Sequence, residues 1–322
     1  MRKLIVLAMV AAGIAGIVAL PAGAAPRGTN GKIVVNVDNN VTGQEQVYAV
    51  DPDGTDMQLL ANDAEAGQWS PDGAKLAIGG NEGTGGYLTF ETGVFTDLGL
   101  PFDRYPDLAL FCGVWSPDGS RLACEGFGQT DGSLNGVYTV RSSDGGDLQR
   151  VTTDPNGDDC PSDYSPNGKR LVITRANDTS FEIDTVKLDG SSSTRITPDG
   201  TAFDFCSGSW SPQGNEILFS AHSPDFGYRS SIWVVHSDGS GLRQLHVVGC
   251  GGPRSDRTSI GCQKPVWSPD GRKLMFERHT FIPSEQFDLY TVNSDGTDLF
   301  QVTHTPNLDE AGGDWGTHPV TP

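Results

Sequence analysis

Trp69-Ser70-Pro71-Asp72-Gly73 is the first of five copies of one short sequence pattern. The others are Trp115-Ser116-Pro117-Asp118-Gly119, Tyr164-Ser165-Pro166-Asn167-Gly168, Trp210-Ser211-Pro212-Gln213-Gly214 and Trp267-Ser268-Pro269-Asp270-Gly271. Their aromatic residues stand 46 to 57 residues apart, and Trp315 follows Trp267 by 48 residues. A repeat of this length indicates a ring or an array of similar structural units.

Each copy predicts a tight turn between two β-strands. Proline fixes its φ angle, aspartate hydrogen-bonds to nearby backbone, and glycine accepts a positive φ. The aromatic residue ends one strand, and a β-rich run such as Arg121-Leu122-Ala123-Cys124 begins the next. A third strand, such as Val137-Tyr138-Thr139-Val140, leads through an Asp-Gly turn to a fourth. Four strands in about 45 residues are typical of one blade of a β-propeller.

The two ends of the chain complete the count of blades. Trp315 has no strands after it, whereas the strands expected at 33–37, 47–50 and 57–60 have no aromatic strand before them. Joining these strands to Trp315 makes a sixth blade and removes the open edge of the ring. The sequence therefore predicts an all-β protein. The expected fold is a single six-bladed propeller with four antiparallel strands per blade, whose last blade combines N- and C-terminal strands.

These repeats resemble the propeller repeats of the TolB family. The resemblance rests on the Trp-Ser-Pro-Asp-Gly turn, the Lys/Arg-Leu-Ala run after it and the later Asp-Gly hairpins, and it covers about residues 30 to 318. TolB carries a separate α/β domain before its propeller, and this chain is expected to lack one. Similar repeats occur in prolyl oligopeptidase-like enzymes and in some polysaccharide lyases, so the resemblance implies architecture and says little about activity.

Residues 1–25 have the pattern of a signal peptide, which leaves residues 26–322 for the propeller. Arg2 and Lys3 precede an apolar run from Leu4 to Leu20, and Ala22-Gly23-Ala24 fits a cleavage site. A membrane anchor is the alternative, because the run is at the lower limit for a spanning helix. No later stretch is apolar enough to cross a membrane. We therefore expect a periplasmic or extracellular protein with no transmembrane span in the mature chain.

The charge of the chain limits its partners. The formal net charge is −19, and it becomes −21 without Arg2 and Lys3. Nucleic acids and anionic membranes attract cationic surfaces, so both are unexpected as partners. We expect a monomer that is kept soluble by its acidic surface.

Six cysteines follow the predicted signal peptide, and their even number predicts disulfides in an oxidising compartment. Pairing Trp115 with Arg121 across the repeat turn places Cys112 opposite Cys124, close enough for a bond. Cys250 and Cys262 flank the longest insertion and are expected to close it. Cys160 and Cys206 each stand four residues before a repeat aromatic, in adjacent blades, and are paired by elimination.

No enzyme motif stands out. The sequence has no G-x-S-x-G, no H-E-x-x-H and no phosphate-binding glycine loop. The Asp-Gly hairpins offer one or two carboxylates each, fewer than a calcium loop needs, so we interpret them as turns. His222 and His279 follow the second strands of neighbouring blades and are weak candidates for a shared metal site. We expect no cofactor and assign no catalytic residue.

The connections between strands suggest where a ligand binds. Those after the first and third strands are uniformly tight, whereas the others are long and irregular, as at 99–111, 247–264 and 303–313. Long loops on a rigid scaffold usually carry function. We therefore predict binding of a protein or cell-envelope polymer at the long-loop face. The predicted binding residues are Tyr105, Tyr228, Arg229 and Arg257. The alternative is a hydrolase or polysaccharide lyase whose active site lies in the mouth of the channel.

Overall fold

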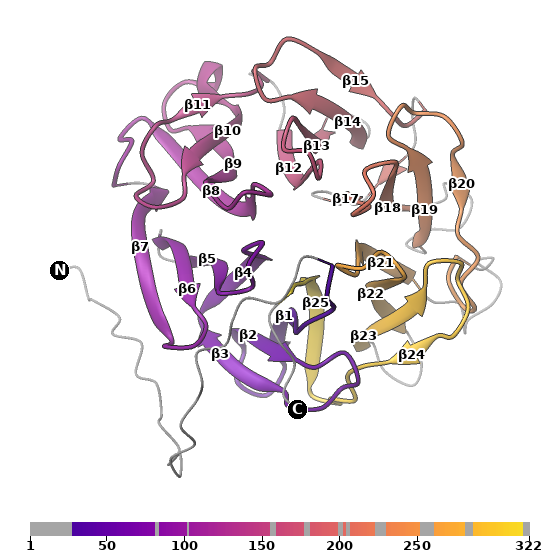
Figure 1. Ribbon diagram of the computed structural model, residues 1–322. Helices are drawn as coiled ribbons and strands as arrows, with labels where there is room; N and C mark the ends of the chain where they lie inside the picture. The colour runs from indigo at the N-terminus through magenta and orange to yellow at the C-terminus, as the bar shows by residue number, and fades with distance from the viewer. Residues whose placement is uncertain are drawn as a thin grey trace.

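A computed structural model of the chain shows six four-stranded antiparallel blades arranged in a ring (Figure 1). The structure describes residues 28–80, 84–101, 103–154, 159–176, 181–198, 202–203, 207–222, 230–251, 261–280 and 286–317. The predicted signal peptide lies outside these residues. No helix in the described ranges is long and apolar enough to cross a membrane. The prediction of a six-bladed, all-β propeller is confirmed.

Within each blade the four strands follow one another from the centre of the ring to its outside. The blades are numbered along the chain. Blade 1 contains β4 (Ala64–Trp69), β5 (Lys75–Gly80), β6 (Thr84–Thr89) and β7 (Val94–Pro101). Blade 2 contains β8 (Leu108–Trp115), β9 (Arg121–Gly128), β10 (Gly136–Arg141) and β11 (Gln149–Arg150), with a short 3-10 helix, η1 (Gly132–Leu134), before β10. Blade 3 contains β12 (Asp159–Tyr164), β13 (Arg170–Ala176), β14 (Phe181–Lys187) and β15 (Ser193–Arg195).

In blade 4 the inner strand is split into two short pieces. These are β16 (Ala202–Phe203) and β17 (Ser209–Trp210), and both pair with β18 (Glu216–His222), which is followed by β19 (Ser230–His236) and β20 (Arg243–Gln244). Blade 5 contains β21 (Gly261–Trp267), β22 (Lys273–Thr280), β23 (Gln286–Asn293) and β24 (Phe300–Gln301). Blade 6 contains β25 (Leu308–Trp315), β1 (Ile33–Asn39), β2 (Gln44–Val50) and β3 (Gln58–Asn62).

Blade 6 closes the ring as predicted. The C-terminal strand β25 is its innermost strand and pairs with β1, so that Trp315 lies opposite Ile33 (Figure 1). The Trp315 indole N–H donates to the Gly31 carbonyl at 3.0 Å. Lys32, only 2% exposed, holds Asp51 and Asp56 at 2.7 and 2.8 Å. Backbone pairing thus joins the N- and C-terminal strands, and a buried ion pair fixes the N-terminal segment.

The repeated turn stabilises itself through its own side chains. In blade 1, the Ser70 hydroxyl accepts from the Lys75 N–H at 2.9 Å and donates to Asp72 at 2.6 Å. Asp72 also accepts from the Ala74 N–H, and Gly73 has a φ of +69°. Serine and glycine keep these roles in all five copies, whereas Asn167 and Gln213 replace the aspartate in two of them.

The hydrophobic core lies between the blades. The cluster around Trp115 joins Tyr87 and Leu100 of blade 1 to Leu122 and Tyr138 of blade 2, and the Trp115 and Tyr87 ring centroids are 5.9 Å apart. Clusters around the other repeat aromatics join neighbouring blades in the same way. Burial of apolar surface at these interfaces, at about 25 cal/mol per Å², is the main force that holds the ring together. The repeat aromatics therefore pack between the blades.

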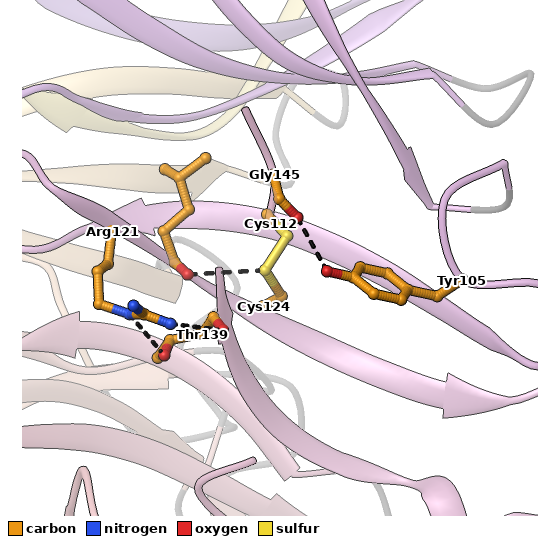
Figure 2. The surroundings of a disulfide bond; sticks show 7 residues. Tyr105, Cys112, Arg121, Cys124, Thr139 and Gly145 are labelled. Carbon is orange, nitrogen blue, oxygen red and sulfur yellow. Dashed lines mark hydrogen bonds between the residues drawn. A yellow bond between two sulfur atoms is a disulfide. The ribbon is translucent and has the colours of Figure 1, made fainter. Parts of the chain in front are cut away.

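Two predicted disulfides are present. Cys112 is bonded to Cys124 (Figure 2), and Cys250 is bonded to Cys262. The register used to predict the first pair was wrong by one residue, because Trp115 lies opposite Leu122 rather than Arg121. A β-bulge between Cys112 and Val114 shifts the register back, so that Cys112 still faces Cys124. Cys160 is also disulfide-bonded, whereas Cys206 lies outside the described residues, so their pairing stays a prediction.

Candidate functional site: a cup at the aromatic end of the channel

The inner strands of all six blades end in an aromatic residue, and these ends surround one cavity. The cavity has a volume of 650 Å³. Its wall is formed by repeat aromatics and by the prolines of the turns that follow them: Trp69, Trp115, Tyr164, Trp210, Trp315, Pro71, Pro117, Pro166, Pro212 and Pro269. We call this cavity the cup. It lies at the end of the channel where the tight turns are, opposite the face predicted to bind.

The turns that surround the cup touch one another. A Cβ atom placed on Gly119 would lie 3.9 Å from the Pro71 ring, and one on Gly168 would lie 3.8 Å from Pro117. The ends of the chain take the sixth place in this ring, where the Thr317 hydroxyl donates to the Pro71 carbonyl at 3.1 Å. The rim is therefore continuous, and each turn is supported by its neighbour.

Two carboxylates lie at the floor of the cup, one residue before the aromatic layer. Asp163 is in blade 3 and Asp314 is in blade 6, so they face the channel from opposite sides of the ring. Asp163 accepts the Trp210 backbone N–H of blade 4 at 2.7 Å, and Asp314 accepts the Trp69 N–H of blade 1 at 2.8 Å. Each carboxylate thus links its blade to the next one.

The same position makes similar links in two other blades. Gln68 accepts the Trp115 N–H at 3.3 Å, and Ser209 accepts the Trp267 N–H at 3.1 Å. The Gln68 amide also donates to the Ser162 carbonyl of blade 3 at 3.1 Å, which brings it across the channel to the carboxylate layer. The floor is therefore a polar layer built from side chains of several blades.

Both floor carboxylates have raised pKa values. Burial raises the pKa of Asp163 to about 7, the Trp210 N–H opposes this shift, and the negative charge of Asp314 adds to it. Burial likewise raises the pKa of Asp314 to about 6, against hydrogen bonds from the Trp69 and Trp315 N–H groups. Both side chains are partly exposed to the cup and otherwise surrounded by protein. The floor therefore changes its charge near neutral pH.

The other charged groups of the cup lie at its rim. Arg272 is the one basic residue among the described residues that line the cup, and Asp270 is close to it. Asp270 belongs to a repeat turn and accepts from the Ser268 hydroxyl at 2.8 Å and from the Arg272 N–H at 3.0 Å. The charged side chains described at the floor are the carboxylates of Asp163 and Asp314.

The predicted binding residues fall in different places. Tyr105 is half-buried against the core cluster between blades 1 and 2, and its hydroxyl donates to the Gly145 carbonyl at 3.0 Å (Figure 2). Its side chain therefore supports the fold. Tyr228, Arg229 and Arg257 lie outside the described residues. The role of these four residues in binding stays a prediction.

His222 and His279 lie within their strands rather than after them, because β18 ends at His222 and β22 ends at Thr280. His279 is 7% exposed, and its ring stacks on Phe287 with centroids 3.9 Å apart. The described residues contain no group of three or more His, Cys, Asp or Glu side chains placed to hold a metal ion.

The Asp-Gly hairpins are turns, as interpreted from the sequence. Asp144 accepts from the Gly146 N–H at 2.9 Å, and Asp295 accepts from the Thr297 N–H at 3.0 Å and from its hydroxyl at 2.6 Å. These hydrogen bonds lower the pKa of both aspartates. Their carboxylates are used to hold the turn.

Comparisons with known proteins support the fold. No protein-family model matches the sequence. An uncharacterized protein of Agrobacterium fabrum is 29% identical over 152 residues, which are 44% of this chain and about half (47%) of that protein. TolB from Acinetobacter baumannii superimposes with a TM-score of 0.66 at 18% identity, over 90% of this chain and 68% of that chain.

An oligogalacturonate lyase in complex with manganese superimposes with a TM-score of 0.57 at 12% identity, over 81% of this chain and 71% of that chain. Identities this low establish shared architecture and do not transfer an activity. The chain therefore has the six-bladed propeller fold of TolB, and its function has to be argued from its own residues.

Proposed function

We propose that this chain is an exported binding protein that engages a protein or a cell-envelope polymer at the cup. The observation that carries the proposal is the 650 Å³ cavity itself, with its aromatic and proline wall and its polar floor. Its volume is within the range of ligand pockets, and mixed apolar and polar lining is typical of them.

The construction of the cup favours binding. Its wall belongs to inner strands and turns that are hydrogen-bonded within and between blades, so little ordering is needed when a ligand arrives. The turn prolines offer apolar contact area at low cost in side-chain entropy, and the repeat aromatics, only 3–6% exposed, support them from behind. The two carboxylates of the floor, Asp163 and Asp314, accept hydrogen bonds from backbone N–H groups of the next blade.

Export is supported by the disulfides. Disulfides form and persist in oxidising compartments, and two are present between described cysteines. We propose cleavage of residues 1–25 and a periplasmic or extracellular location on this basis together with the N-terminal sequence pattern.

A plug at the rim tests the proposed function. Gln213 is exposed and lines the cup, so Gln213→Trp should obstruct its opening. Gln58→Trp is the matched control, because Gln58 is exposed on the outer strand β3. Immobilised wild-type chain and both variants are incubated with envelope extract of the host. We expect Gln213→Trp to lose the captured partner and Gln58→Trp to retain it. A partner retained equally by Gln213→Trp would refute the cup as the binding site.

A lyase or hydrolase with its active site in the mouth of the channel stays a prediction from the sequence, and the weak metal candidates His222 and His279 are the residues to vary. Incubation of the purified chain with polygalacturonate, followed by ultraviolet absorbance, tests it directly. Turnover that is lost in His222→Ala or His279→Ala would replace the binding proposal.

A further inference from the structure

We propose that the floor of the cup binds an organic cation, and that the partner is a protein segment which inserts a lysine or arginine side chain. This inference rests on the proposed function and names the chemistry of the same site.

Among the described residues, no basic side chain lies at the floor. Asp163 and Asp314 are close enough for the charge of one to raise the pKa of the other. The groups described around them are the Gln68 amide and the backbone N–H groups of Trp69, Tyr164, Trp210 and Trp315, all of which are neutral. Arg272 is at the rim beside Asp270. Two buried like charges repel one another, and a cation between them would relieve this repulsion.

The wall suits the alkyl part of a basic side chain. Lysine and arginine carry apolar stems that pack along aromatic and proline surfaces while their charged ends reach a polar site. The turn prolines offer this surface, because the repeat aromatics behind them are only 3–6% exposed. A cup with an apolar wall and an acidic floor therefore matches a long side chain with a positive end.

The carboxylates are held in position before any ligand arrives. Each accepts a hydrogen bond from the inner strand of the next blade, at 2.7 and 2.8 Å. Preorganised acceptors lose little freedom on binding, which favours affinity. A bound cation stabilises the ionised forms, so binding should release protons and weaken as the pH falls below the pKa values of about 6 and 7.

Small analogues of the two side chains test the inference. Tryptophan fluorescence of the mature chain is recorded during titration with n-butylammonium or n-butylguanidinium at constant ionic strength, because four tryptophans line the cup. We expect saturable binding at pH 8 that is about tenfold or more weaker at pH 5, since both carboxylates are then largely protonated. The uncharged analogue n-butanol should bind at least tenfold more weakly than either cation at pH 8.

The double variant Asp163→Asn with Asp314→Asn keeps an oxygen for each backbone N–H and removes both charges. We expect it to lose the preference for the cations over n-butanol. The matched control is Asp97→Asn, an exposed residue of the outer strand β7 whose carboxylate accepts from the Gly99 N–H. It should bind like the wild type. If the double variant does not fold, the wild-type pH dependence and the comparison with n-butanol still decide the question.

Equal binding of n-butanol and the cations, or affinity for the cations that is the same at pH 5 and pH 8, would overturn the inference. Binding of Ca²⁺ to the floor without displacement by either organic cation would also overturn it. These failures leave the proposed function intact, because a partner lost on Gln213→Trp would still mark the cup as the binding site.

Discussion

Replacing Asp163 by asparagine should stabilise the protein at high pH and have little effect at low pH. The folded state raises the pKa of this carboxyl from an ordinary 3.8 to about 7. The folded protein therefore holds the proton more strongly than the unfolded chain does, and ionisation of Asp163 costs stability as the pH rises from about 4 to 7. At 1.36 kcal/mol for each tenfold change in proton affinity, the cost reaches at most about 4 kcal/mol.

Asparagine avoids this cost and can still accept the Trp210 N–H, which the aspartate holds at 2.7 Å. Because Asp163 is partly exposed, solvent screening lowers this cost, so we expect the free energy of unfolding to rise by about 1–3 kcal/mol at pH 8, a gain that vanishes near pH 4. The assay is urea unfolding at pH 4.5, 6 and 8, followed by tryptophan fluorescence. Asp97→Asn should show no such trend. A wild type that is more stable than Asp163→Asn at pH 8, or a difference independent of pH, would refute the reasoning.

Three further changes test how the ring is held together. Lys32→Met should lower the free energy of unfolding, measured with urea, by about 3–5 kcal/mol, because it removes the buried ammonium group that contacts Asp51 and Asp56. Lys273→Met, at the equivalent but more exposed ion pair, should lower it by at most about 1 kcal/mol. Gly316→Ala should lower the melting temperature, since a Cβ there would overlap the Trp69 side chain, while Gly79→Ala has open space and should change it little. Removing residues 312–322 truncates β25 and exposes the inner edge of β1, so light scattering should reveal aggregation. Removing residues 26–29 should cause none. A chain without residues 312–322 that melts like the intact one would contradict closure by β25.

The fold could be predicted because the residue types of the repeat turn determine its geometry. Serine, aspartate and glycine each have a defined hydrogen bond or φ angle in that turn, so five copies fix five blades. The closing blade followed from counting strands at both ends of the chain. Bulges could not be predicted in the same way. The irregular register of β8 against β9 leaves no clear sign in the sequence, although the disulfide it permits was predicted correctly.

Inner strands were harder to recognise than the others. Residues 303–313 were assigned to a long loop, but β25 begins at Leu308. The start of this strand lacks the alternation of apolar and polar residues that marks a strand: its sequence is Leu308-Asp309-Glu310-Ala311-Gly312-Gly313. One edge of the strand faces the channel, and Gly313 approaches the backbone of Val34. Likewise β8 begins at Leu108, inside the loop expected at 99–111.

The cup was missed because the tight turns were regarded as structural only. A signal was present in the residue before each repeat aromatic. This position is polar in four of the six blades, as Gln68, Asp163, Ser209 and Asp314. A polar residue next to a buried aromatic, repeated around a ring, indicates a polar layer across the channel. Sequence spacing alone could not show that Asp163 and Asp314 face the channel from opposite sides, because this depends on the closed ring.

Site-specific photocrosslinking tests most directly whether the ligand docks at the cup or at the long-loop face. The photoreactive residue p-benzoylphenylalanine replaces Gln213 at the rim of the cup in one chain and Arg229, in a predicted long loop, in another. Both chains are irradiated in envelope extract of the host, and adducts are resolved by electrophoresis and identified by mass spectrometry. Our account predicts a discrete adduct from position 213 that is abolished by excess n-butylguanidinium, and none from position 229. A discrete adduct from position 229 alone would contradict the account and place the binding surface on the long-loop face.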